Sequence, residues 1–272
     1  LSLSLSLSLS LSLSLSLSLS PVGAHLNPAV TLSFCSLGRV PWVKLLPYSL
    51  CQVLGAYLAS GLVFLVYYDA IMDFSGGNLT VYGANETASI FATYPVEHLS
   101  LSSSILDQVV GTAMLMLCIL PLDDQKNSPA PDALIPPIVA VVVLGISMSM
   151  SSNCGGAINP ARDLGPRLLT LTAGWGTEVF TAGGGWFWVP LVAPFLGAMV
   201  GVALYQLFIE LHHPPLQLES NGLCLENKMA PSLEAMELGL KSFPKDIRSQ
   251  SLAVIQLDIE KATHLEEKVS HL

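Results

Sequence analysis

The sequence predicts an all-α membrane protein, an inverted-repeat helical bundle with two half-helices. Hydrophobic residues make up 51% of the 272 residues and charged residues only 11%, against roughly 25% in soluble domains. The last 61 residues, from His212 onward, hold six of the eleven Lys and Arg and nine of the twenty Asp and Glu. An Asn-Pro-Ala triplet occurs twice in the apolar part, at 27–29 and 159–161. We therefore expect a membrane-embedded body followed by a tail outside the membrane over 212–272.

Four long apolar stretches are expected to cross the membrane as helices. Each is close to the length of about 20 residues that spans a hydrocarbon core of about 30 Å. The stretches are 44–68, 105–122, 134–150 and 186–211. In the last of them, Gly197 and Gly201 form a GxxxG pattern, which favours close approach of a neighbouring helix.

Two Asn-X-Thr sequons, beginning at Asn78 and Asn85, indicate which side of the membrane each loop faces. N-glycosylation at either site requires the loop 69–104 to face the exterior or lumen. The opposite end of the first span, near Arg39, is then cytoplasmic, as the positive-inside rule favours. Alternation of the spans also makes the loop 123–133 and the C-terminal tail cytoplasmic.

Each Asn-Pro-Ala triplet is expected to begin a short helix. Asn is a strong N-cap residue, and Pro is favoured at the first helical position because its missing N–H has no partner there anyway. The segments that follow are too short to cross a bilayer, so each helix must begin at membrane depth, buried in protein or beside a water-filled cavity. The topology then brings the two N-termini together head to head, with both positive dipole ends at one site. The predicted junction residues are Asn27, Pro28, Ala29, Asn159, Pro160 and Ala161.

The paired triplets, with Arg162 after the second, resemble the aquaporin (major intrinsic protein) family over about 21–215. The stretches "GGNLTV", "ETASIFATYP" and "NPARDLGPR" resemble its aquaglyceroporin branch. The resemblance implies a multi-pass plasma-membrane channel without a cofactor, assembled in the lipid bilayer as a homotetramer. Its expected solutes are water, glycerol and small neutral molecules such as urea.

The resemblance also assigns roles to single residues. Asn27 and Asn159 are expected to donate amide N–H groups to a solute, and the opposed helix ends are expected to repel protons and cations. Arg162 corresponds to the selectivity-filter arginine, which donates to hydroxyl groups and rejects cations.

Selectivity for glycerol is predicted from the residues around Arg162. By alignment, Gly156 and Ser147 occupy two further filter positions, and their small size favours a constriction wide enough for a carbon backbone. Four positions match residues that glycerol-conducting members share: Asp163, Arg167, Pro190 and Leu191. The spacing of Asp163 and Arg167 also suits an ion pair within one helix.

Two residues near the triplets have more than one interpretation. His25 is either a neutral imidazole bonded to nearby backbone or a proton sensor on the cytoplasmic side, because His titrates near physiological pH. Cys154 is either a mercurial target or a buried, inert cysteine.

The N-terminus departs from the expected inverted repeat. Two apolar stretches precede the second triplet, whereas only residues 1–20, ten Leu-Ser repeats, stand before the first. We interpret this low-complexity tract as a translated microsatellite or gene-model error that has displaced the first two transmembrane helices. The channel domain 21–211 is then N-terminally incomplete.

Other classes of protein are less compatible with the sequence. No basic patch suggests nucleic-acid binding, the scattered cysteines indicate neither a metal site nor a disulfide framework, and no nucleophile–base pair or cofactor loop suggests an enzyme. The remaining alternatives are a water-selective channel and a non-conducting, truncated membrane protein.

Overall fold

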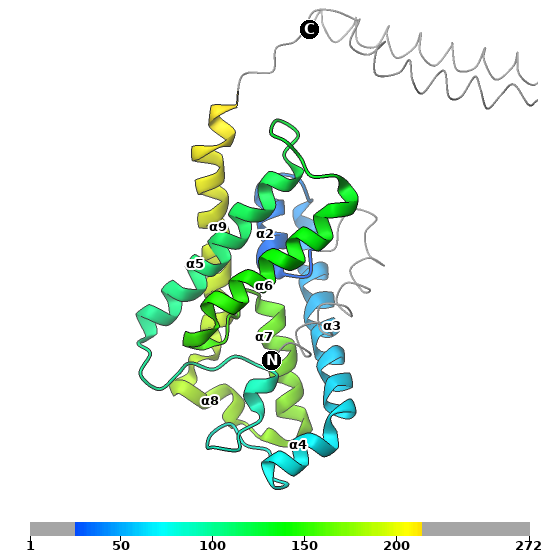
Figure 1. Ribbon diagram of the computed structural model, residues 1–272, viewed down its shortest axis with the longest axis vertical. Helices are drawn as coiled ribbons and strands as arrows, with labels where there is room; N and C mark the ends of the chain where they lie inside the picture. Colours follow the sequence, from blue (N-terminus) through cyan, green and yellow to red (C-terminus); the bar gives the residue numbers. More distant parts are fainter. Residues whose placement is uncertain (1–24, 214–272) are drawn as a thin grey trace, which may run out of the picture. The chain divides into compact units, whose positions relative to one another are not determined.

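The computed structural model describes residues 25–213, and these residues are drawn in colour in Figure 1. Within this range the regular secondary structure is entirely helical, as predicted. The Leu-Ser tract and residues 214–272 of the predicted tail lie outside the described residues.

Four long helices correspond to the four predicted spans: α3 (Leu45–Val66), α5 (Leu101–Ile119), α6 (Ile135–Cys154) and α9 (Val189–Phe208). With their adjoining turns, all four are long and apolar enough to cross a membrane. Helix α6 extends past the predicted end at residue 150, because its polar residues continue the helix until Gly155 adopts a left-handed φ of 80°. Glycine carries little penalty in this conformation and commonly ends helices.

Both predicted half-helices are present, as α2 (Pro28–Ser36) and α7 (Pro160–Thr170). Figure 1 shows α2 in the upper half of the described bundle and α7 in the lower half. Two further short helices, α4 (Tyr68–Ser75) and α8 (Glu178–Gly185), lie in connecting segments for which the sequence analysis predicted no helix. The remaining turns are η1 (Trp42–Lys44), η2 (Ala88–Ile90), η3 (Leu120–Asp123), η4 (Asp132–Leu134), the π-helical η5 (Leu171–Trp175), η6 (Trp186–Trp188) and η7 (Glu210–His212).

Glycines allow the helices to approach one another closely. Helix α9 packs against α5, and a Cβ atom added at Gly201 would lie only 2.7 Å from the Ala113 carbonyl oxygen. Helix α7 packs against α3, where a Cβ atom added at Gly165 would lie 2.7 Å from Ala56 Cβ. The predicted role of the GxxxG pattern is therefore confirmed, and Gly165 is a further contact of the same kind.

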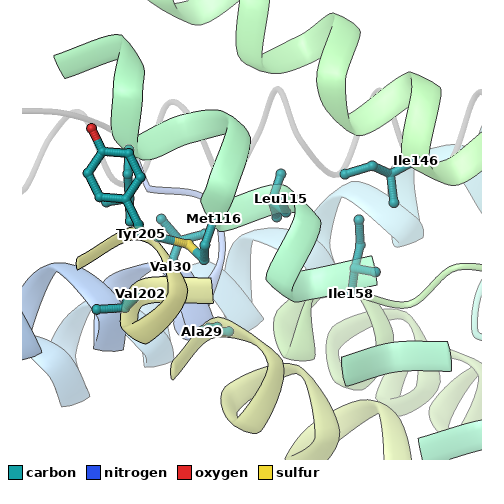
Figure 2. Close-up of a cluster of buried hydrophobic side chains, with 10 residues drawn as sticks. Ala29, Val30, Leu115, Met116, Ile146, Ile158, Val202 and Tyr205 are labelled. Carbon is teal, nitrogen blue, oxygen red and sulfur yellow. The ribbon is translucent and has the colours of Figure 1, made fainter. Parts of the chain in front are cut away.

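A buried apolar cluster holds the half-helix α2 in place. Figure 2 shows Ala29 and Val30 of α2 together with Met116 of α5 and Val202 of α9. Ile158, which precedes the second triplet, belongs to the same cluster. The first half-helix and the junction with the second therefore share one core.

A polar cluster joins three segments at one end of the bundle. Arg39, after α2, lies 3.4 Å from Asp123, after α5. The neighbouring Asp124 carboxylate accepts hydrogen bonds from the Tyr205 hydroxyl at 2.5 Å and from His213 Nε2 at 2.8 Å. Burial alone would raise the pKa of Asp124, but these hydrogen bonds lower it to about 2. The segment after α2, the loop after α5 and the segment after α9 therefore meet at one end of the bundle. These are the three segments that the predicted topology places on the cytoplasmic side.

Candidate functional site

The two Asn-Pro-Ala triplets begin their helices as the sequence predicts. The Asn27 side-chain oxygen accepts a hydrogen bond from the backbone N–H of Ala29 at 2.9 Å. The Asn159 side-chain oxygen accepts from the backbone N–H groups of Ala161 at 3.0 Å and Arg162 at 3.3 Å. Proline follows both N-cap residues. Asn therefore satisfies N–H groups that the first turn of a helix leaves unpaired.

The amide groups of the two N-cap residues bond across the junction between the half-helices. Asn27 Nδ2 donates to the carbonyl oxygen of Ile158, and Asn159 Nδ2 donates to that of Leu26, both at 2.9 Å. Leu26 and Ile158 have positive φ angles of 57° and 39°, which non-glycine residues rarely adopt and which cost about 1–2 kcal/mol each. The hydrogen bonds exchanged between the two halves hold Leu26 and Ile158 in this strained conformation.

Each junction amide retains one N–H for another partner. An Asn side chain carries two N–H groups, and the cross-junction bond uses one of them. In residues 25–213, no protein acceptor is assigned to the second N–H of Asn27 or Asn159. Two half-helix N-termini and two amide donors therefore meet at one point, where a small hydroxyl-bearing molecule would find hydrogen-bond donors.

Arg162 lies in the first turn of α7 and is buried, with only 8% of its surface exposed. Its Nη1 donates to the carbonyl oxygen of Phe91 at 3.1 Å. Its Nε is buried and lacks a protein acceptor among the described residues. The ion pairs of residues 25–213 do not include Arg162. Within the described residues, the structure therefore provides no carboxylate partner for this guanidinium, and its bond to Phe91 uses only one of its five N–H groups.

Gly156 and Ser147, the two predicted filter positions of small size, are neighbours. A Cβ atom added at Gly156 would lie 3.7 Å from Ser147 Cα and 3.0 Å from Ser151 Oγ, and Gly156 has a φ of 58°. A larger residue at 156 would therefore be strained in its backbone and would press on α6. The structure brings the two residues together, and their action as a filter stays a prediction.

The four positions that the resemblance associates with glycerol-conducting members lie in two places. Asp163 and Arg167 form the predicted ion pair, with Arg167 Nε 2.8 Å from Asp163 Oδ1, and both side chains are fully buried. Pro190 is buried in the first turn of α9, and Leu191 is half-buried beside it. The buried pair acts on neighbouring protein groups, not directly on a solute.

The site also depends on two buried amide residues that the sequence analysis did not identify. Gln108 in α5 accepts a hydrogen bond from the backbone N–H of Ile158 at 2.8 Å. Gln52 in α3 donates to the Thr31 hydroxyl of α2 at 3.1 Å. Gln108 thus joins the segment before α7 to α5, and Gln52 joins α2 to α3. Burying an amide in an apolar span costs free energy unless the amide is hydrogen-bonded. The presence of Gln52 and Gln108 within apolar spans was therefore the sequence signal that could have revealed these contacts.

The structure gives His25 and Cys154 defined partners. His25 Nδ1 lies 3.2 Å from the Thr31 hydroxyl, and its ring stacks on Phe34 at 4.9 Å. The imidazole of His25 therefore pairs with a side-chain hydroxyl and not with the backbone group that the first interpretation expected. Proton sensing by His25 stays a prediction. Cys154 is 1% exposed, and Gln108 Nε2 donates to its sulfur at 2.9 Å, which favours the inert interpretation.

Comparison with known proteins identifies the family to which this chain is similar. The family model for the major intrinsic protein matches residues 1–205. Human aquaporin-10 is 56% identical over 192 residues, covering 71% of this chain and 64% of the relative. Human aquaporin-9 is 47% identical over 192 residues, covering 71% of this chain and 65% of the relative.

A solved structure extends the comparison to the fold. The X-ray structure of the aquaglyceroporin from Plasmodium falciparum matches with a TM-score of 0.62 and 31% sequence identity. The match covers 69% of this chain and 73% of that one. This chain spans slightly less than two thirds of the length of the two human relatives. The chain is a multi-pass membrane protein that belongs to the major intrinsic protein family, in its aquaglyceroporin branch.

Proposed function

We propose that this protein is a passive channel for water, glycerol and other small neutral solutes such as urea. The observation that carries the proposal is the junction of α2 and α7, where Asn27 and Asn159 each retain an amide N–H. A hydroxyl oxygen passing between them accepts these hydrogen bonds in place of bonds from water. Solutes then move down their gradients without a cofactor.

The same junction would exclude ions. The N-terminus of a helix carries roughly half a positive charge, so two opposed N-termini present about one positive charge to the passage. Arg162 adds a full positive charge nearby. Cations and protons are therefore repelled electrostatically, while neutral solutes bind through hydrogen bonds.

The small size of Gly156 and Ser147 supports glycerol as a solute over strict water selectivity. Neither residue carries a bulky side chain, so a passage lined by them would accommodate a carbon backbone that a bulky filter residue would exclude. The relative from Plasmodium falciparum is an aquaglyceroporin, which supports the same choice of solute. The similarity to aquaporin-10 and aquaporin-9 fits this proposal as well.

The resemblance supports a homotetramer in the plasma membrane, with the end that carries Asp124 in the cytoplasm. The opposite loop, with Asn78 and Asn85, then faces the exterior, and both side chains are exposed. We expect glycan on at least one of them, seen as a gel band that sharpens after enzymatic removal of N-glycans. Glycan at a sequon introduced next to Asp124 would overturn this orientation.

The proposal is tested by measuring glycerol and water uptake in proteoliposomes containing the full chain. Ser147→His is expected to narrow the passage and reduce glycerol uptake more than water uptake. Ser149→His is the matched control, because Ser149 is exposed on the same helix and its substitution should change neither flux. Water uptake without glycerol uptake by the unaltered protein would favour a water-selective channel, and loss of both would favour a non-conducting protein.

A further inference from the structure

Three side chains of α7, from Arg162 in its first turn to Arg167 in its last, bind one short segment of the loop between α4 and α5. Arg162 Nη1 donates to the Phe91 carbonyl at 3.1 Å. Asp163 Oδ2 accepts from the Thr93 backbone N–H at 2.9 Å and also from the Thr93 hydroxyl. Arg167 Nη2 donates to the Thr93 carbonyl at 2.5 Å. The backbone of this segment is therefore paired with α7 at Phe91 O, Thr93 N and Thr93 O.

Asp163 and Arg167 are committed entirely to protein groups. Arg167 donates to Asp163 through Nε at 2.8 Å and through Nη2 at 3.0 Å, and its Nη1 donates to the Val179 carbonyl at 2.6 Å. Arg167 also lies 4.7 Å from the centre of the Tyr94 ring. Because this pair is buried and bonded on all sides, its effect on a solute has to pass through the residues that it holds.

Phe91 is fixed on its ring side as well. Its ring makes edge-to-face contacts with Trp175 at 5.4 Å and Phe64 at 6.2 Å. Trp175 Nε1 in turn donates to the Thr87 hydroxyl at 3.0 Å. The position of the Phe91 carbonyl is thus determined by an aromatic cluster on one side and by Thr93 on the other.

Arg162 is held much less completely than Arg167. Its guanidinium makes one described hydrogen bond, to Phe91 O, and its Nε has no protein acceptor among residues 25–213. A shift of the Phe91 carbonyl would therefore turn the guanidinium and redirect its unpaired N–H groups.

We propose that Thr93, Asp163 and Arg167 are positioning residues that orient the Arg162 guanidinium through the Phe91 carbonyl and thereby set the solute selectivity. This inference deepens the proposed function and rests on it. It gives the buried residues Asp163 and Arg167, which the resemblance associates with glycerol-conducting members, a way to affect glycerol without touching it.

The test uses two substitutions at Thr93 that differ in the hydroxyl group. Thr93→Val removes the hydroxyl and keeps the branched shape, whereas Thr93→Ser keeps the hydroxyl and removes only a methyl group. A hydrogen bond to a charged group changes a local equilibrium by roughly ten- to a hundredfold. Asp163→Asn is unsuitable as the main variant, because it leaves the Arg167 charge buried without its partner and is expected to destabilise the fold.

The first readout does not depend on transport. Phenylglyoxal labelling of Arg162 in the purified protein is followed by mass spectrometry, with the more exposed Arg39 as an internal reference. Because Arg162 is buried, its labelling follows transient local opening. We expect labelling about tenfold faster in Thr93→Val than in the unaltered protein, and an unchanged rate in Thr93→Ser.

The second readout is the ratio of glycerol to water permeability in proteoliposomes. We expect this ratio to fall several-fold in Thr93→Val, because a turned guanidinium obstructs the larger solute more, and to be restored in Thr93→Ser. Unchanged Arg162 labelling in Thr93→Val, or equal changes in both variants, would overturn the positioning role. If the unaltered protein passes no glycerol, the proposed function fails, whereas the Arg162 labelling still decides whether Thr93 holds the guanidinium.

Discussion

Replacing Asn159 by Asp or by Ser separates two roles of this residue, the helix cap and the amide donor. Both replacements keep a side-chain oxygen that accepts from the first turn of α7, since Asp and Ser are good N-cap residues. Both lose the amide that donates to the Leu26 carbonyl at 2.9 Å. Only Asp adds a negative charge. A difference between the two variants therefore reports the electrostatics of the junction.

The expected magnitudes follow from the geometry. Leaving the Leu26 carbonyl without its donor costs about 1–3 kcal/mol, so we expect glycerol permeability to fall roughly five- to a hundredfold in both variants. The two helix N-termini together carry about one positive charge, which one carboxylate offsets. A unit charge acting over about 4 Å contributes on the order of 4 kcal/mol at an effective dielectric constant near 20. This corresponds to roughly a thousandfold in the rate of cation passage.

The assay compares glycerol uptake with potassium flux in proteoliposomes, the latter read from a potential-sensitive dye. The unaltered protein and Asn159→Ser should show no potassium flux above that of empty vesicles, whereas Asn159→Asp should show a clear flux. Equal potassium exclusion by all three proteins would refute the assignment of charge selectivity to this junction.

Three further predictions concern packing and the polar cluster. Gly201→Leu should lower the thermal unfolding midpoint in detergent, because overpacking costs about 1–3 kcal/mol, and an unchanged midpoint would contradict the close α9–α5 contact. The matched Gly145→Leu should have little effect, because a Cβ atom there meets nothing within 4 Å. Because the pKa of Asp124 is lowered from 3.8 to about 2, its ionised form stabilises the fold above about pH 4, and this contribution is lost as the pH falls from about 4 to 2. The stability difference between the unaltered protein and Asp124→Asn should therefore shrink over that window, and a constant difference would show that the carboxylate is not stabilised there.

The elements that the sequence predicted are those with local causes. Asn27 and Asn159 begin their helices because capping depends on a few adjacent residues. The Asp163–Arg167 pair follows from spacing within a single helix. The spans follow from length and composition, and the close contact at Gly201 from a four-residue pattern.

The parts that the sequence did not predict depend on contacts between distant segments. Nothing local to Phe91 or Thr93 indicates that their backbone groups would pair with α7, about 70 residues away in the chain. The positive φ angles of Leu26 and Ile158 arise from the exchange of hydrogen bonds between the two halves. Such conformations are unfavourable for these residue types locally, so only the assembled junction explains them.

The glycines at the end of α8 show a further local cause. Residues 183–185 are three consecutive glycines, and all have positive φ angles. Glycine runs predict turns, and the backbone of α8 is indeed non-helical at Ala182, Gly183 and Gly184. The three glycines therefore form the turn that leads into η6 and α9.

The most direct test of the central claim is the simultaneous measurement of glycerol and proton flux through the unaltered protein. Proteoliposomes with an internal pH-sensitive dye are given a glycerol gradient and, separately, a pH gradient. We expect glycerol uptake well above that of empty vesicles, with proton leakage no greater than theirs, since Asn27, Asn159 and Arg162 present donors and positive charge to the passage. Proton leakage that rises together with glycerol uptake, or no glycerol uptake above that of empty vesicles, would contradict this account.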